Sequence, residues 1–223
     1  MALTDKLSAI GSAIREKTGK TELLSLDAMP TEIRAIQTGS GGNTAIINSI
    51  LDGSVKTIND SDLTGIVSLR DYVFYYHPEL ESITLPDTLQ LIGTAAFEHC
   101  EKLTTVNAFG VVSIFAYAFY NCSELSYIDL PVSLWLIGND AFSNSGLTEV
   151  TIPANVFTVG DSAFAWCNNL TTVTFKGTPN DIGSGCFSFS NSLTDIYVPW
   201  SEGAVANAPW GADNATIHYN SEV

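Results

Sequence analysis

The chain has 223 residues, of which 45% are hydrophobic and only 15% are charged, and its formal net charge is −15. This balance excludes disorder for most of the chain, because disordered segments are poor in apolar residues and rich in charge. The acidic excess argues against a nucleic-acid partner, which needs a basic patch. The four cysteines are too few for a disulfide scaffold. The absence of any run of 18 apolar residues predicts no membrane insertion.

The first residues do not follow the pattern of a secretory signal. Such a signal begins with basic residues and continues into an apolar core, whereas the chain starts Met-Ala-Leu-Thr-Asp-Lys-Leu. We therefore expect no classical secretion signal. On this basis the protein either stays inside the cell that made it or leaves by a route that needs no signal.

Residues 1–38 are predicted to form a small helical hairpin. Apolar residues recur there at steps of three and four, which is the stripe of an amphipathic helix. The two stripes consist of Leu3, Leu7, Ile10 and Ile14, and of Leu26, Met29, Ile33 and Ile36. A unit of this size rarely holds a core alone. The hairpin is thus predicted to serve attachment or oligomerisation, and the alternative is a simple cap on the main domain.

A glycine-rich linker, residues 39–44, separates the hairpin from a part of different composition. The first 39 residues hold five basic and five acidic side chains, whereas the rest holds four basic and 19 acidic ones. The whole net charge therefore lies after residue 39. The composition shift and the Gly-Ser-Gly-Gly run predict a flexible joint between two parts.

The second part is an internal repeat of 22 or 23 residues. A leucine begins each unit, a β-branched residue follows three positions later, and a phenylalanine follows near the end. The leucines are Leu80, Leu103, Leu125, Leu147, Leu170 and Leu193, and the phenylalanines are Phe97, Phe119, Phe142, Phe164 and Phe187. An irregular first unit, from Val55 to Phe74, has about two extra residues. A unit this short cannot bury its own apolar edge, so the units must stack into a solenoid with a continuous core.

Each unit predicts the same succession of elements. The Leu-x-x-Ile-x-Leu segment predicts a short strand that a proline ends, and a second short strand is expected around residues 89–92. A glycine such as Gly93 would permit a tight turn. The Ala-Phe pair is expected to form one helical turn with its ring in the interior. We assign residues 45–199 to the solenoid, with residues 45–53 as its N-terminal cap and residues 200–223, including Trp200 and Trp210, as its C-terminal cap.

The pattern resembles the BspA-like leucine-rich repeat family. The resemblance rests on Leu80-x-x-Ile83-x-Leu85-Pro86, on Ile92-Gly93 and on Ala96-Phe97-x-x-Cys100, repeated over residues 55–199. It implies a right-handed solenoid with short parallel strands, used for adhesion or recognition and without enzymatic chemistry. The expected fold class is therefore an α+β repeat solenoid with an added helical hairpin, and the expected protein is no enzyme.

Two weaker resemblances point to phages. Residues 2–38 are similar to a helical module that precedes binding domains in tail-associated proteins of phages and prophages of Gram-positive gut bacteria. Residues 196–200, 208–211 and 215–219 are similar to the ending of related prophage proteins. They imply a receptor-binding component of a tail, located in the virion or in the cytoplasm before lysis, that recognises a bacterial surface and oligomerises through residues 1–38.

Two other functions remain open. One is a cell-associated adhesion protein of a gut bacterium that binds a host protein or glycan, and the other is a scaffold inside the cell. Surface proteins of the BspA-like type normally carry an export signal, which the first residues here lack. The expected partner is a protein or glycan on a cell surface, and no cofactor is expected.

One repeat position holds His77, Cys100, Cys122 and Cys167. Aligned sulfur and imidazole could bind zinc, or the cysteines could form a ladder disulfide. However, Ser145 and Ser190 fill the same slot, and no Cys-x-x-Cys pair occurs. An inert small residue in the core is the favoured interpretation, so we expect no metal site. His99 beside Cys100 does not predict a catalytic pair, since adjacent residues at a turn usually point apart.

Two kinds of surface residue are candidates for binding. The outward strand positions form a polar band, which reflects either strand propensity or a recognition face. Its bulkiest or charged members include Tyr127, Asp129 and Glu149. Aromatic residues at places expected to be polar are the second kind. They could contact a ligand, contact another subunit, or do neither. Trp135 and Phe157 occupy the slot of Gln90 and are expected to stack, and a further series comprises Tyr75, Tyr76, His99, Tyr120, Trp166 and Phe189.

Overall fold

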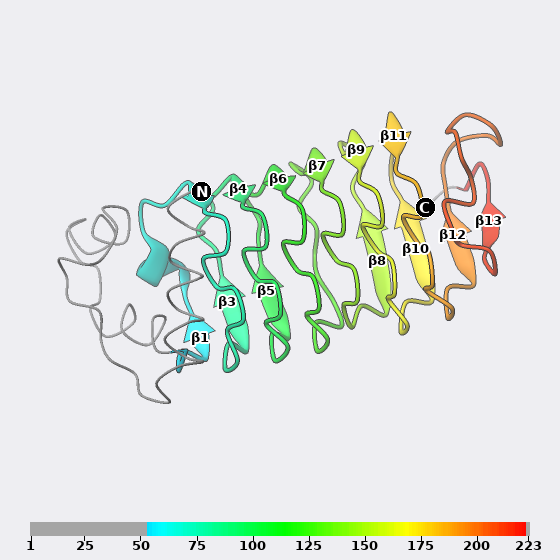
Figure 1. The fold of residues 1–223 in the computed structure, drawn as a ribbon. Coiled ribbons are helices and arrows are strands. Elements are labelled where there is room, and N and C mark those ends of the chain that lie inside the picture. Colours follow the sequence, from blue (N-terminus) through cyan, green and yellow to red (C-terminus); the bar gives the residue numbers. More distant parts are fainter. Residues whose placement is uncertain (1–52, 222–223) are drawn as a thin grey trace.

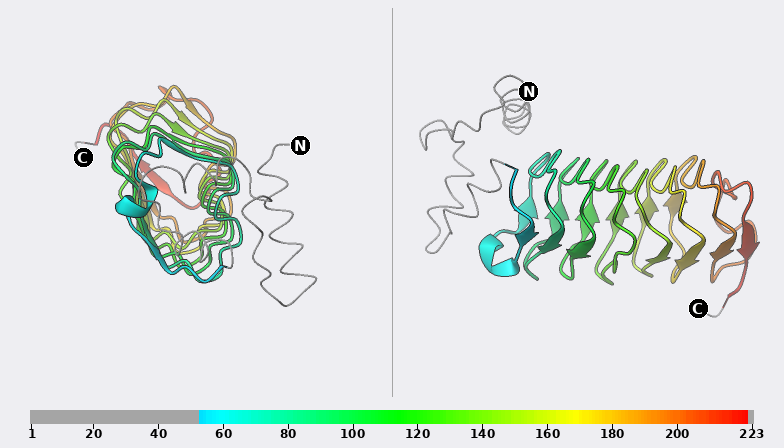
Figure 2. Two further views of the ribbon diagram at one scale, coloured as in Figure 1. Left: turned by 90° about the vertical axis from the view of Figure 1, so that its left-hand side faces the viewer. Right: turned by 90° about the horizontal axis from the view of Figure 1, so that it is seen from below.

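The computed structural model describes residues 53–221. The chain winds through stacked coils from β1 at one end to β13 at the other (Figure 1). The coils superimpose when they are viewed along the stacking direction (Figure 2). The predicted hairpin, the linker and residues 45–52 of the predicted N-terminal cap lie outside the described residues.

Parallel strands line two faces of the solenoid, and each strand pairs with its equivalent one coil away. The first face carries the sheet of β1 (Thr57–Ile58), β3 (Ser82–Thr84) and β5 (Thr105–Asn107), then the sheet of β8 (Glu149–Ile152), β10 (Thr172–Phe175), β12 (Asp195–Tyr197) and β13 (Thr216–His218). The second face carries β2 (Ser68–Leu69), β4 (Leu91–Ile92), β6 (Ser113–Ile114), β7 (Leu136–Ile137), β9 (Thr158–Val159) and β11 (Asp181–Ile182). Both predicted strands of the unit are confirmed.

The predicted helical turn after the second strand is wrong. Along this segment the backbone N–H groups alternate between a local partner and the next coil. Phe97 N–H donates to Ala118 O at 2.8 Å, whereas Glu98 N–H donates to Ala95 O at 3.2 Å within its own coil. Left-handed φ values of 54° at Ala95 and 60° at His99 permit this alternation. The segment is therefore a third inter-coil ladder, and the α part of the predicted fold class has no support among residues 53–221, where the helix present is η2, a 3₁₀ helix (Asp60–Leu63).

Departures from the regular repeat have local structural causes. The two extra residues of the first unit fall in the η2 segment between β1 and β2. The units that begin at Leu103 and Leu125 are one residue short, and each has a glycine where it is shortened. A Cβ on Gly110 would lie 2.0 Å from Asp87 O, and one on Gly146 would lie 2.2 Å from Ser123 O. The strand ladder of the first face is interrupted in the same region, at residues 127–129 between β5 and β8.

The glycines that follow the second strand are needed for a different reason from the predicted one. Gly93, Gly138, Gly160 and Gly183 do not have a left-handed φ. Instead, a Cβ on Gly160 would lie 2.5 Å from Asn139 N of the preceding coil. Close approach of successive backbones, and not a left-handed turn, thus excludes a side chain there.

A single file of phenylalanines runs through the core, as the repeat predicts. Neighbouring rings stack with centroids 5.1 Å apart for both Phe97–Phe119 and Phe119–Phe142, and 5.2 Å apart for Phe142–Phe164. All of these rings are fully buried. This file connects the hydrophobic interior of one coil to that of the next, so the core is continuous along the solenoid.

Trp200 and Trp210 pack against Phe175 at the C-terminal end of the described solenoid. Their rings lie 5.2 Å and 6.3 Å from Phe175, and both are buried. Trp210 Nε1 donates to Ala206 O at 2.7 Å, which holds the capping loop in place. Within residues 53–221 no helix is long and apolar enough to cross a membrane.

Candidate binding surface

The column of cysteines has a hydrogen-bonding role inside the core. The thiols of Cys100 and Cys122 donate to the carbonyl oxygens of Phe74 and Phe97 of the preceding coil, at 3.0 and 3.2 Å. Ser190 Oγ makes the equivalent bond to Phe164 O at 2.8 Å. The slot therefore accepts a small buried side chain that can donate a hydrogen bond, which explains why both serine and cysteine occur there. All four cysteines are free and buried, and among residues 53–221 no group of three His, Cys, Asp or Glu is placed to hold a metal.

Burial makes these thiols chemically inert. It raises the pKa of Cys100 to about 12 and that of Cys167 to about 11, from an ordinary 9.0. We expect the native protein to resist iodoacetamide at pH 8, and all four thiols to react after unfolding in urea, as measured by mass spectrometry. The folded-state pKa values lie above the ordinary value of 9.0, so the folded protein holds its thiol protons more tightly than the unfolded chain does. The free energy of unfolding should therefore be unaffected by these thiols below about pH 9 and should decrease as the pH rises above it. Rapid alkylation of the native protein would contradict the assigned burial.

The threonines that precede the strands of the polar band donate hydrogen bonds to backbone carbonyl oxygens of the preceding coil. Oγ1 of Thr148 donates to Ser126 O at 3.2 Å, and Oγ1 of Thr171 donates to Thr148 O at 3.1 Å. Thr104 and Thr194 make the same kind of bond. This part of the band is therefore explained by structure alone.

Three other residues of the band lie near the interruption of the ladder. Tyr127 and Asp129 are exposed in the coil that has no assigned strand on this face, and Glu149 is exposed at the start of β8. The side chain of Tyr127 is 57% exposed. The exposed Tyr127 remains a candidate contact, although it is not part of a larger aromatic group.

The predicted stack of Trp135 on Phe157 is confirmed. Their ring centroids lie 5.1 Å apart and the ring planes differ by 5°. The two side chains remain 49% and 44% exposed. They precede β7 and β9 at an edge of the second face. Two large apolar rings thus form a fixed and accessible pair.

The second aromatic series divides between two columns. Tyr75 and Tyr120 directly follow the buried phenylalanine of their coils, whereas Tyr76, His99, Trp166 and Phe189 follow it by two positions. The alternating turn geometry separates these positions, because only the second has a left-handed φ. In the left-handed column, which we call the aromatic column, Tyr76 stacks on His99 and Trp166 stacks on Phe189, each at 4.2 Å.

Two asparagines occupy the positions between the two aromatic pairs of this column. Asn121 Nδ2 lies 2.8 Å from His99 Nδ1, and Asn144 Nδ2 donates to Asn121 Oδ1. The column therefore has a polar centre between its stacked ends. The repeat register indicates both asparagines, but sequence reasoning selected only aromatic side chains.

Sequence reasoning also missed two exposed apolar residues. Phe109 is 59% exposed and Val132 is 79% exposed. Phe109 occupies the slot that proline fills in other units, such as Pro86 and Pro131. A large apolar ring in a slot that other units fill with proline was the signal that could have identified it.

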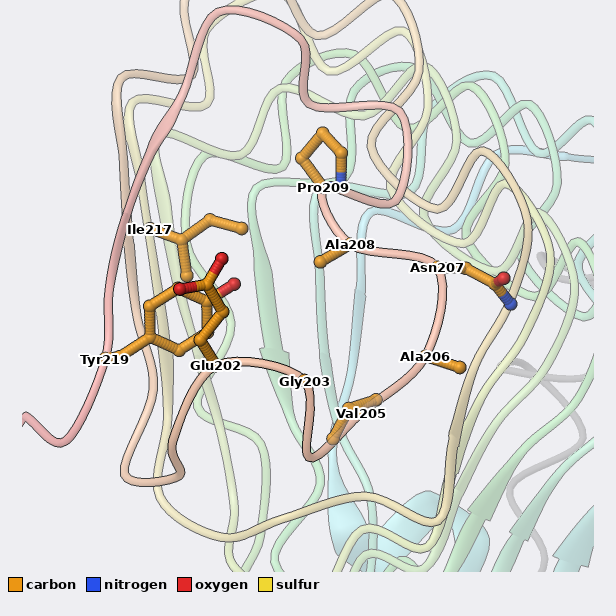
Figure 3. A pocket seen from close by; sticks show the side chains of 9 residues that line it. All are labelled: Glu202, Gly203, Val205, Ala206, Asn207, Ala208, Pro209, Ile217 and Tyr219. Carbon is orange, nitrogen blue, oxygen red and sulfur yellow. The ribbon is translucent and has the colours of Figure 1, made fainter.

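An open cavity of about 470 Å³ lies at the C-terminal end (Figure 3). The capping loop, residues 202–209, forms one side, and Ile217 and Tyr219 form the other. Its one charged lining residue is Glu202. This cavity lies beside the last strand, β13, and its lining includes none of the residues of the aromatic pairs.

Comparisons with known proteins identify the repeat. Six copies of the BspA type leucine rich repeat region match residues 67–194, which is more than half of the chain. A leucine-rich repeat protein from Bacteroides ovatus ATCC 8483 is 35% identical with a TM-score of 0.55, over 60% of this chain and 35% of that one. A leucine-rich repeat protein of T. pallidum is 29% identical with a TM-score of 0.60, over 66% of this chain and 70% of that one.

The chain thus spans about a third of the length of the Bacteroides ovatus protein. No curated protein matches it. The family match covers the same units whose leucines and phenylalanines stack in the structure. The chain therefore belongs to the BspA-type leucine-rich repeat family.

Proposed function

We propose that the chain is a non-enzymatic binding protein that contacts another protein through the exposed aromatic pairs of its solenoid. Bacterial surface and adhesion proteins built from leucine-rich repeats suggest a protein-binding role. The observation that carries the proposal is the presence of fixed, half-exposed aromatic stacks, Trp135 on Phe157 and Trp166 on Phe189. Aromatic side chains are enriched at the energetic centres of protein interfaces.

The orientation of the rings favours a protein over a glycan. A pyranose stacks on the face of an aromatic ring, but within each pair both rings give one face to each other. Trp135 and Phe157 have nearly parallel planes, so each ring has its edges and only one face left for other contacts. Ring edges pack well against aliphatic and aromatic side chains. A protein surface therefore fits this pair better than a sugar does.

The solenoid also holds these rings in place before binding. Backbone bonds join successive coils on two sheet faces and along the alternating turn segment. A surface that is already ordered loses less conformational entropy when a partner binds. This preorganisation supports a recognition role for the outer surface.

The replacement of both Trp135 and Phe157 by alanine should weaken partner binding about 30-fold or more, because the loss of a central aromatic contact costs about 2 kcal/mol or more. The melting temperature should change little, since both side chains are half exposed. Binding of the labelled protein to whole bacterial cells and to extracts of host epithelial cells measures the first effect. Thr151→Ala, on the exposed strand face, is the matched control. Unchanged binding, or a large loss of stability, would contradict this role.

We further propose that the setting is a phage or prophage tail, with residues 1–38 providing attachment or oligomerisation. The support is the resemblance of residues 2–38 to the helical module of tail-associated proteins. Mass spectrometry of purified particles after prophage induction tests this setting, and absence of the chain from the particles would favour a cell-associated adhesion protein.

Deletion of residues 1–39 should lower the mass measured by light scattering, and an unchanged mass would remove the oligomerisation role.

A further inference from the structure

A half-buried carboxylate lies within a group of tyrosines near the N-terminal end of the described solenoid. Glu98 shares its repeat position with Tyr75 in the preceding coil and Tyr120 in the following coil. Its own side chain is 19% exposed. Three residues earlier in each coil, a second column holds Tyr72, Ala95 and Tyr117 in the same three successive coils.

The rings around this carboxylate contact one another in a connected set. Tyr75 meets Tyr76 edge to face at 4.9 Å, and Tyr117 meets Tyr120 at 5.8 Å. The ring of His99 joins the two groups, with 4.2 Å to Tyr76 and 5.7 Å to Tyr120. Tyr76 and Tyr117 are 48% and 42% exposed, so the set is accessible from solvent.

Negative charge dominates this location. Burial raises the pKa of Glu98. The pKa of Tyr75 is raised first by burial and then by the charge of Glu98. The pKa of Tyr117 is raised first by Asp140, then by burial, and further by Glu98. The geometry agrees with these shifts, because backbone hydrogen bonds join these coils in register. Glu98 thus lies in the column of Tyr75 and Tyr120, and Asp140 follows Tyr117 in the neighbouring column.

The described residues supply no full positive charge to balance Glu98. Among residues 53–221, the basic side chain within 4 Å of this carboxylate is His99, whose Nε2 lies 3.9 Å from Glu98 Oε1. Burial lowers the pKa of His99 despite the opposing effect of Glu101. His99 Nδ1 also lies 2.8 Å from the Asn121 amide nitrogen, which requires an unprotonated nitrogen as acceptor. His99 is therefore a neutral neighbour, and the negative charge of Glu98 remains available.

We propose that Glu98 and the surrounding Tyr75, Tyr76, Tyr117 and Tyr120 form a site for a lysine or arginine side chain of the protein partner. The tyrosine faces and edges surround an alkyl chain, and the carboxylate pairs with its terminal cation. A partly desolvated carboxylate with aromatic neighbours attracts a cation more strongly than a fully solvated one does. This inference rests on the proposed function and gives one chemical requirement of the partner.

Titration of the full chain with small probes tests the site without the partner. The probes are the N-acetyl methylamides of lysine, arginine and norleucine, together with tetramethylammonium chloride, followed by NMR shifts of residues 95–99 and 117–121. The lysine or arginine probe should bind with a dissociation constant on the order of millimolar, and norleucine should not bind. Glu98→Gln should weaken binding about 10-fold, whereas Glu124→Gln, an exposed carboxylate of the next coil, should not change it.

Three results would overturn the site. The first is binding of the norleucine probe as tight as that of the lysine or arginine probe. The second is binding of tetramethylammonium without binding of the lysine or arginine probe. The third is an unchanged affinity in Glu98→Gln. Tyr120→Ala provides a second variant, and circular dichroism melting checks that each variant is folded. If these probes fail while Trp135→Ala with Phe157→Ala still weakens partner binding, the cation site is wrong and the proposed function stands.

Discussion

Phe119→Ala should destabilise the solenoid by about 3–5 kcal/mol, which is the usual cost of removing a buried phenylalanine. Phe119 is fully buried, and it stacks on Phe97 and Phe142 with ring centroids 5.1 Å apart on both sides. The substitution leaves a cavity in the middle of the file, where rigid backbone ladders prevent the coils from closing over it. Urea unfolding followed by far-ultraviolet circular dichroism measures the change.

Phe109→Ala is the matched control for this experiment. Its side chain is 59% exposed, so its removal should change the free energy of unfolding by less than about 1 kcal/mol. A loss of similar size in both variants would mean that burial in the file does not determine stability. A loss below about 1 kcal/mol for Phe119→Ala would contradict the continuous core.

Gly110→Ala should cost about 3 kcal/mol or more, although it adds only one methyl group. A Cβ at this position would lie 2.0 Å from Asp87 O and 3.0 Å from Leu89 O, and both are backbone atoms of the preceding coil. Successive coils would have to separate, which would weaken their hydrogen bonds. Differential scanning calorimetry should show a correspondingly lower melting temperature.

Gly65→Ala separates steric clash from backbone strain. Gly65 has φ +81°, and a Cβ there would meet nothing within 4 Å. Its replacement should cost only about 1–2 kcal/mol, from the left-handed conformation. If Gly65→Ala were as harmful as Gly110→Ala, close packing of the shortened coil would not be the cause.

The repeat made most of the fold predictable. Leucine and β-branched positions define the two strands, and the alignment of Phe97 with Phe119 predicts their stack, because parallel coils in register place equal positions side by side. The chain could not reveal that Ala95 and His99 adopt left-handed φ values. Alanine does not favour that conformation, and inter-coil hydrogen bonds from Ala95 and His99 stabilise it.

The candidate surface was predictable only in part. The stack of Trp135 on Phe157 follows from register alone. The division of the second aromatic series does not, because it depends on which residue takes the left-handed turn. The Glu98 group was missed because it combines tyrosines of neighbouring positions with a single acid, and no spacing along the chain indicates that combination.

The same architecture explains both stability and recognition. The interior is filled by residues that repeat with little variation, such as the file of phenylalanines. The outward positions carry few structural constraints, so they can vary between coils. Residues as different as Trp166 and Asn144 therefore share one position of the aromatic column.

The most direct test is site-specific photocrosslinking. A benzoylphenylalanine at position 157 probes the Trp135 pair, and one at position 174, on strand β10, probes the polar face. With bound cells or host extract as the source of partner, we expect one dominant protein crosslinked from position 157, absent after Trp135→Ala, and none from position 174. Equal crosslinking from both positions, or crosslinking from position 174 alone, would contradict the assignment of the aromatic pair as the binding surface.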